Sequence, residues 1–365
     1  MGETNLLLKV GENEGIAVDT FGGRVHVEWD PAGAATPLGH LAFFIEFLKA
    51  GGLYEPWVKG CPLHYSSPNA PHVRDVLGTV LLSVLAGHKR YAHITSIRCD
   101  SVNPDLLGMR KVISEDAVRR ALMQIEERPG VEWLERHLQI SFEELLVQPW
   151  ILDIDTTVKP LYGHQEGAVV GYNPKKPGRP SHTYHSYMMA NTRLIMDVEV
   201  LAGNHSQASY SADGLWELLK RLPRASWPVF IRGDVSWGSE TFMSKAEEKG
   251  VSYLTKLRLT RNVKRYIERV FRSGEWIDAG QGWEGAEGNL KLTGWSRNRR
   301  VIVLRRAMTG EVMITKDKED HQKQFAFIET EGPVKYYEYA VLVTSLGDEI
   351  CTISQHYRDR ADLRE

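Results

Sequence analysis

The chain has 365 residues, of which 42% are hydrophobic and 25% charged, and its net charge is −2 at pH 7. This composition is typical of a globular protein of two or three domains, and it excludes a chain that is basic throughout, although it allows local basic patches. Cys61, Cys99 and Cys351 are too far apart for a zinc module or a disulfide framework, no signal-peptide pattern starts the sequence, and no apolar run approaches the roughly 20 residues that span a bilayer, so we expect a cytoplasmic protein with no membrane partner.

The first predicted elements are two strands in an N-terminal β-hairpin segment, residues 1–37. The region 38–148 is predicted to be mainly helical, because apolar residues recur at three- and four-residue steps. Ser114 is expected to cap one helix, with Ile113 and Val118 forming a hydrophobic staple across the cap. The stretch 103–128 could be a helix–turn–helix DNA reader, although an ordinary helical packing unit is the favoured interpretation. The strands are expected at 6–10 and 24–29, and the helices at 38–50, 72–87, 115–126 and 131–146.

From residue 149 onward, strands alternate with helices, which predicts an α/β fold built on a mixed sheet. The segment 149–257 forms the first part of this core, and 258–350 is expected to be a β-rich insertion. Residues 351–365 are predicted to start the final core helix. Strands are expected at 150–158, 182–190, 192–202, 227–233 and 251–257, and helices at 213–222 and 238–249.

Three aspartates lie within or directly after apolar runs that are predicted to be strands. Asp153 and Asp155 are two residues apart in the run 150–158, so their side chains point to the same face of the predicted strand. Asp234 follows the apolar run 227–233. Aspartate is disfavoured in a strand and needs a partner there, and a divalent metal ion held by Asp155 and Asp234 is one such partner. The alternative is that Asp234 caps the next helix and that Asp155 makes a buried hydrogen bond or ion pair.

Basic residues follow each of these aspartates, as phosphate-binding groups should. A single basic run is usually a solvated face, so their joint position carries the prediction. Trp237, Trp283 and Trp295 could stack on unpaired bases, although most tryptophans are core residues. The expected phosphate contacts are Lys175, Lys176, Arg179, Lys256, Arg258, Arg299 and Arg300.

The chain resembles the DDE transposases of bacterial insertion sequences, the cut-and-paste group with a ribonuclease-H-like catalytic core. The resemblance rests on motifs spread over roughly residues 30–365. They are Leu152-Asp-Ile-Asp-Thr-Thr157, Tyr162-Gly-His-Gln-Glu-Gly-Ala168, Gly171-Tyr-Asn-Pro174, Ile231-Arg-Gly-Asp-Val-Ser-Trp-Gly238, Tyr253-Leu-Thr-Lys-Leu-Arg258 and Tyr357-Arg-Asp-Arg-Ala-Asp362.

The resemblance implies that Asp155 and Asp234 hold catalytic metal ions and that Tyr357 and Arg360 contact phosphates near the cut. The family's third carboxylate is a glutamate four residues after this arginine, a position that Arg364 occupies here, and Glu365 follows one residue later. One residue along a helix turns a side chain by about 100°. Glu365 could serve after a local shift, the chain could be truncated or frameshifted and inactive, or Asp153 or Glu166 could take its place.

The resemblance also implies an activity and its partners. Mg²⁺, with Mn²⁺ as a substitute, would activate water to nick a transposon end, and the freed 3′ hydroxyl would then attack a second phosphate. The implied partners are the terminal inverted repeats and target DNA, bound by a homodimer to which the region 38–148 contributes. The rivals are a nuclease of the same fold without strand transfer, an inactive remnant that binds transposon ends, and a carboxylate-dependent sugar hydrolase, against which the basic segments argue.

Overall fold

The computed structural model describes residues 16–20, 23–27, 33, 35–147, 149–173, 176–205, 208–308, 325–326 and 336–360. The chain divides into two compact units, Met1–His137 and Leu138–Glu365. In the first unit, β1 (Ile16–Thr20) and β2 (Gly23–Val27) form an antiparallel hairpin. β2 overlaps the predicted strand 24–29, whereas the predicted strand 6–10 lies outside the described residues.

The rest of the first unit is helical, as predicted. Its core contains buried side chains of α3, such as Val76, Leu77 and Leu82, together with Leu41 and Val118. The last helix continues past His137 into the second unit, so the helical region is not a separate unit up to residue 148. The helices are α1 (Leu41–Ala50), α2 (Tyr54–Lys59), α3 (Val73–Leu85), the 3₁₀ helix η1 (Tyr91–Ile97), α4 (Val102–Leu106), α5 (Glu115–Leu122) and α6 (Glu127–Phe142).

The predicted cap at Ser114 is present, since its hydroxyl accepts a hydrogen bond from the backbone N–H of Ala117 at 3.3 Å. Ile113 and Val118 are both buried, as the staple requires. The stretch 103–128 is not a helix–turn–helix, because α4 has only five residues and residues 107–114 separate it from α5. A helix–turn–helix needs a turn of about 3–4 residues. The packing-unit interpretation is therefore the correct one.

The second unit is built on one large mixed sheet in the order β4-β5-β3-β7-β8-β13-β11-β10-β9, with β6 on β5 and β12 on β13. β3, β5 and β6 are antiparallel, while β7 and β8 run parallel to β3. This mixed α/β arrangement confirms the predicted fold class. The strands are β3 (Ile151–Pro160), β4 (Val169–Val170), β5 (Pro180–Met189), β6 (Leu194–Ala202), β7 (Phe230–Gly233), β8 (Ser252–Lys256), β9 (Ile277–Gly280), β10 (Trp283–Leu290), β11 (Arg299–Ala307), β12 (Phe325–Ala326) and β13 (Tyr336–Thr344).

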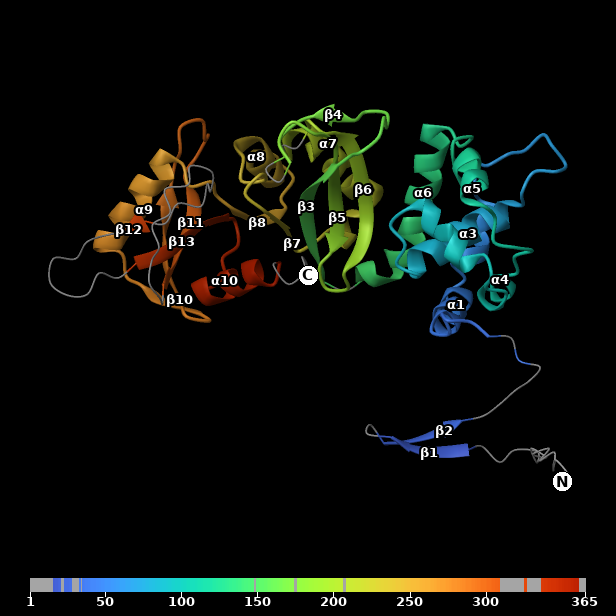
Figure 1. Ribbon diagram of the computed structural model, residues 1–365. Coiled ribbons are helices and arrows are strands. Elements are labelled where there is room, and N and C mark those ends of the chain that lie inside the picture. The colour runs from blue at the N-terminus through green and yellow to red at the C-terminus, as the bar shows by residue number, and fades with distance from the viewer. Residues whose placement is uncertain are drawn as a thin grey trace, which may run out of the picture. The chain divides into compact units, whose positions relative to one another are not determined.

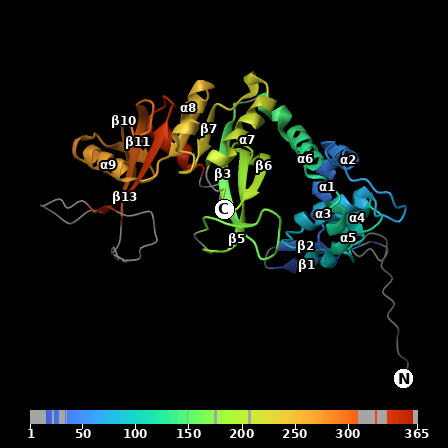
Figure 2. The same ribbon diagram turned by 90° about the horizontal axis from the view of Figure 1, so that it is seen from above.

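Helices cover both faces of this sheet (Figure 1 and Figure 2). Leu215 of α7, Phe242 of α8 and Ile267 of α9 share a buried cluster with Leu152 and Ile154 of β3. On the opposite face, α10 packs in a second cluster with β8, β11 and β13. Because β3 alternates its side chains, the face of Asp153 and Asp155 is the α10 face. The helices are α7 (Ala208–Arg221), α8 (Glu240–Glu248), α9 (Arg261–Ser273) and α10 (Ile350–Arg358), with 3₁₀ turns η2 (Glu143–Val147) and η3 (Arg224–Ser226).

The segment 258–350 differs from the prediction in two ways. It starts with α9, a helix whose apolar face, Val263, Tyr266, Ile267 and Val270, recurs at helical spacing. Its strands also continue the core sheet, because β13 pairs antiparallel with β8. The strands of the β-rich segment thus join the same sheet as the core strands.

Along the described part of the chain, no helix has the length and apolar character to cross a membrane.

Candidate active site

The parallel pairing of β3 with β7 brings the two predicted metal-binding aspartates together. Asp153 lies opposite Arg232 and Ile154 opposite Gly233, so Asp155 and Asp234 each directly follow the last paired residues. Neighbouring strands lie about 4.7–4.9 Å apart. Both aspartates therefore lie at the end of the strand pair where β7 stops.

Asp155 is accessible and already has a cationic neighbour. Its side chain is 32% exposed, and its Oδ1 accepts a hydrogen bond from Arg360 at 2.7 Å. The same guanidinium group donates to the carbonyl of Ile154 at 3.2 Å. The ion-pair alternative is therefore correct in part for Asp155. Arg360, expected at a DNA phosphate, is buried against this carboxylate.

Asp234 sits in a tight turn between β7 and α8. Its Oδ1 accepts hydrogen bonds from the backbone N–H of Ser236 at 2.8 Å and from the Ser236 hydroxyl at 2.5 Å. The N-cap of α8 is Ser239, whose hydroxyl accepts from Phe242. Asp234 is therefore not the helix cap.

Two glycines allow this turn to pack closely. A Cβ at Gly233 would come within 2.8 Å of the Trp237 Cβ and 3.1 Å of Ile154, and one at Gly238 would meet the Lys256 carbonyl at 2.6 Å. Trp237 is fully buried beneath the turn and Trp295 is also buried, so the predicted base stacking by these two tryptophans is wrong. Trp283 is half-buried and packs under Arg306.

Asp153 cannot replace a third ligand. Its side chain is 4% exposed, and both oxygens accept hydrogen bonds from Arg232, at 2.5 and 2.7 Å. Glu166 is also far from Asp155 along the sheet. Its backbone carbonyl oxygen lies 2.7 Å from Nε2 of His182 on β5, and His182 is four residues away from Ser186, the residue that pairs with Asp155. At about 3.4 Å per residue this is roughly 13 Å along the strand. Glu365 and Arg364 lie outside the described residues.

The donor set suits a hard divalent cation. Mg²⁺ takes oxygen ligands and is commonly held by one or two carboxylates, with water and substrate phosphate completing its shell. Asp155 and Asp234 are two carboxylates at one end of the β3–β7 pair, and the Asp155 side chain is 32% exposed. Within the described ranges, no group of three or more potential metal ligands occurs.

The basic loop after β3 forms an exposed cluster around Tyr162. Arg179 lies 4.4 Å and Lys176 4.8 Å from the centre of the Tyr162 ring, and Lys176 donates a hydrogen bond to its hydroxyl. Because of Lys176, the pKa of Tyr162 is lowered. Lys175 lies outside the described residues. The sequence motif contains Tyr162, but we had not predicted its role as the platform for these cations.

The expected phosphate contacts on β11 have structural roles instead. Arg299 is 4% exposed and pairs with Glu240 at 2.5 Å and Glu247 at 2.7 Å. Arg300 pairs with Glu287 at 2.7 Å and donates to the carbonyls of Leu346 and Asp348. Arg299 is buried and cannot reach DNA, and the donors of the partly exposed Arg300 are engaged by Glu287 and two carbonyls.

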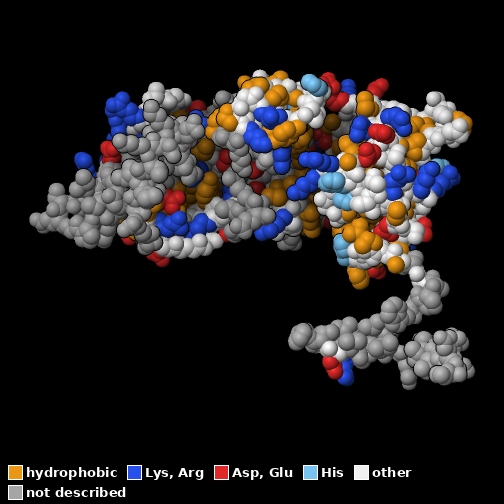
Figure 3. Space-filling model, viewed as in Figure 1, with side chains coloured by type: hydrophobic (Ala, Val, Ile, Leu, Met, Phe, Trp, Pro, Cys, Tyr) orange, Lys and Arg blue, Asp and Glu red, His pale blue; other side chains and the backbone are white. Residues whose placement is uncertain are grey.

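The other expected contacts differ in exposure. Arg258 is exposed, Lys256 is half-buried, and Tyr357 packs partly buried against the α10 cluster. On the face seen in Figure 3, basic side chains lie in several small groups rather than in one continuous patch. Such local groups are compatible with a near-neutral net charge.

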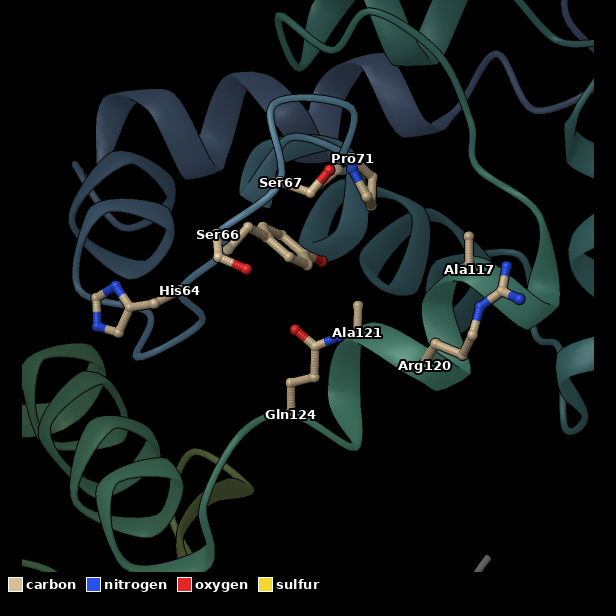
Figure 4. Close-up of a pocket in the computed structure, with 10 residues that line it drawn as sticks. His64, Ser66, Ser67, Pro71, Ala117, Arg120, Ala121 and Gln124 are labelled. Atoms are coloured by element: carbon tan, nitrogen blue, oxygen red, sulfur yellow. The ribbon is translucent and has the colours of Figure 1, made fainter.

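A cavity of about 290 Å³ lies within the first unit. Figure 4 shows the segment around His64, Ser66 and Ser67 on one side and Arg120 and Gln124, at the end of α5, on the other. The described residues that line it include no carboxylate.

Comparisons with known proteins identify the family of this chain. The family model "Transposase DDE domain group 1" matches residues 66–362. No curated protein sequence matches the chain. A solved piggyBac transposase synaptic complex with hairpin DNA has 12% sequence identity and a TM-score of 0.40, over 89% of this chain and 66% of that one. The chain thus spans just under two thirds of that transposase's length.

Proposed function

Because the chain belongs to the group 1 family of transposase DDE domains, we propose that it cleaves transposon ends and joins them to target DNA by phosphoryl transfer. The observation that best supports this proposal is the parallel pairing of β3 with β7, whose last paired residues, Ile154 and Gly233, directly precede Asp155 and Asp234. A third carboxylate, Glu365, would complete the ligand set. The cofactor would be Mg²⁺, with Mn²⁺ as a substitute.

The reaction needs two displacements at phosphorus. In the first, water attacks a phosphate at the transposon end, the P–O3′ bond breaks, and the departing 3′ oxygen takes up a proton. In the second, this 3′ hydroxyl attacks another phosphate, and the 3′ oxygen of that strand leaves. Divalent ions, when bound, activate the attacking oxygen and neutralise the leaving one.

The residues of this chain would position the DNA and the ions. Asp155 and Asp234 would hold the ions, and Tyr357 and Arg360 would lie beside the phosphate at the cut. Arg360 would then exchange its contact with Asp155 for one with a phosphate, a group that a guanidinium fork binds well. Lys175, Lys176, Arg179, Lys256 and Arg258 would contact flanking phosphates.

We propose double-stranded DNA as the partner, first the terminal inverted repeats and then the target. Transposition joins two ends, so the active form would be a homodimer on DNA, with the region 38–148 contributing to end binding. The protein would act at the nucleoid in a bacterial cytoplasm.

The test mixes the full chain with DNA that carries the ends of its transposon, in the presence of Mg²⁺ or Mn²⁺. We expect cleavage, and we expect Asp155→Asn or Asp234→Asn to slow it by at least ~10³-fold, since metal activation contributes several kcal/mol and each 1.36 kcal/mol is tenfold. Undiminished cleavage by either variant would contradict the assignment.

A supercoiled target added to the same reaction separates the rivals. Joined products support a transposase, and cleavage without joining indicates a nuclease of the same fold. Specific end binding without metal-dependent cleavage indicates an inactive remnant.

A further inference from the structure

Arg232 on β7 is a buried arginine whose three side-chain nitrogens donate hydrogen bonds to residues of β3 and α10. Its side chain is 2% exposed. Nε and Nη2 donate to the two oxygens of Asp153 at 2.5 and 2.7 Å, and Nη1 donates to the backbone carbonyl of His356. One guanidinium group on β7 therefore joins β3 to α10.

The contact with His356 anchors the end of a helix. α10 ends at Arg358, so the His356 carbonyl is among the last four, which have no partner within the helix. A cation at this end also interacts favourably with the helix dipole. The chain that leaves α10 is thereby held beside β7, and Arg360 follows four residues after the anchored carbonyl.

The three elements that meet at Arg232 carry the candidate active site. Asp155 stands two residues after Asp153 on β3, and Asp234 stands two residues after Arg232. Arg360 follows α10. We propose that Arg232 is the positioning residue of this site, acting through Asp153 and His356 to set the distance between the two aspartates and the direction of the chain after α10. This inference rests on the proposed function.

The ordinary alternative is a buried ion pair that only stabilises the fold. Removing one partner of such a pair costs about 3–5 kcal/mol, whereas replacing both by apolar residues is often neutral. A planar fork is needed to bind both oxygens of Asp153 and a carbonyl at once, and lysine cannot supply it. A measurement of metal affinity distinguishes the two roles, because a purely stabilising ion pair would not change the affinity of the folded protein for the metal.

Arg299 offers a matched control. Its side chain is also 2% exposed and is also held by carboxylates, those of Glu240 and Glu247. It lies on the α8 face of the sheet, away from the aspartates. Arg299→Lys should therefore lower stability without changing the metal site.

The experiment measures Mn²⁺ binding to the full-length chain by electron paramagnetic resonance, with a thermal melt of each variant. Arg232→Lys, and the double variant Asp153→Leu with Arg232→Met, should weaken Mn²⁺ binding by about 10- to 100-fold, the usual effect of losing a group that orients metal ligands. The double variant replaces both charged partners by apolar side chains, so we expect it to fold. Arg299→Lys should bind Mn²⁺ like the wild type.

Each outcome decides between the two ideas. Unchanged Mn²⁺ affinity in a folded Arg232→Lys or double variant overturns the positioning role and leaves the proposed function intact. An equal loss of affinity in Arg299→Lys overturns it as well, because the effect is then general. If wild-type protein binds no Mn²⁺, or Asp155→Asn with Asp234→Asn binds it equally well, both the proposed function and this inference fail.

Discussion

Asp153 and Asp155 stand two residues apart on β3 and share a face, yet their surroundings differ. Asp153 is 4% exposed and bound by Arg232, while Asp155 is 32% exposed beside Arg360. The difference arises because β7 ends at Gly233. Asp155 therefore reaches the edge where the strand beside it has turned away, and a ligand can approach it.

Gly233 makes this edge possible. Adding a Cβ there would produce a 2.8 Å contact with the Cβ of Trp237, which is fully buried and cannot move freely. We expect Gly233→Ala to lower the free energy of unfolding by about 1–3 kcal/mol, the usual cost of overpacking. Denaturant unfolding checks this. Gly347→Ala is the control in the same unit, because a Cβ at Gly347 meets nothing within 4 Å; equal effects would refute the steric argument.

At the scale of elements, α8 is tied to the sheet by the ion pairs of Arg299 on β11. Burial pushes the pKa of Glu240 upward, but hydrogen bonds from Arg299, Ser296 and Ser244 outweigh it and lower the pKa to about 2. Because the folded pKa is depressed, the pair stabilises the fold fully above the ordinary glutamate pKa. This contribution is lost as the pH falls toward 2.

Unfolding measured across this range provides the test. Glu240→Gln should destabilise the protein by about 3 kcal/mol near neutral pH, as expected for one lost partner of a buried pair. The difference from wild type should shrink as the pH falls from about 5 to 3. Glu248→Gln breaks the exposed Lys245 pair and should change stability by less than about 1 kcal/mol. A pH-independent difference for Glu240→Gln would argue against the assigned linkage.

At the scale of the whole molecule, a net charge of −2 means that any DNA affinity must come from local groups. Among the described residues, the cluster of Lys176 and Arg179 on Tyr162 is the strongest candidate for such a DNA-binding group. Each phosphate contact contributes about 0.9 to the slope of the logarithm of DNA affinity against the logarithm of salt concentration.

We therefore expect Lys176→Ala and Arg179→Ala each to reduce that slope by about 0.9 in titrations with end DNA. Lys245→Ala, which removes a cation paired with Glu248 on α8, is the control and should leave the slope unchanged. A steep wild-type salt dependence that neither loop variant reduces would move the DNA contacts elsewhere on the chain.

Much of the fold followed from the sequence because periodicity is a local property. The helices α1, α3, α5 and α6, the cap at Ser114, and β3, β5, β7 and β8 lie close to their predicted positions, whereas α2, η1 and α4 had not been predicted. The two aspartates were also found locally, since a charged residue in an apolar strand is conspicuous. α9 was missed even though its apolar face repeats at helical spacing, because its basic residues drew the interpretation toward DNA.

The sequence by itself determined the class of the fold, and it predicts two candidate metal-binding carboxylates, Asp155 and Asp234. Only the tertiary structure decided which charged residues are available to a ligand. Arg299, Arg300 and Asp153 resemble binding residues in sequence, but each is engaged by an oppositely charged partner from a distant segment. Asp155 follows Asp153 by two residues, and Asp234 follows Arg232 by two residues. This equal spacing has a structural consequence only because β3 and β7 pair with Asp153 opposite Arg232. Periodicity acts within a few residues, whereas burial and ion pairing depend on which distant strands become neighbours.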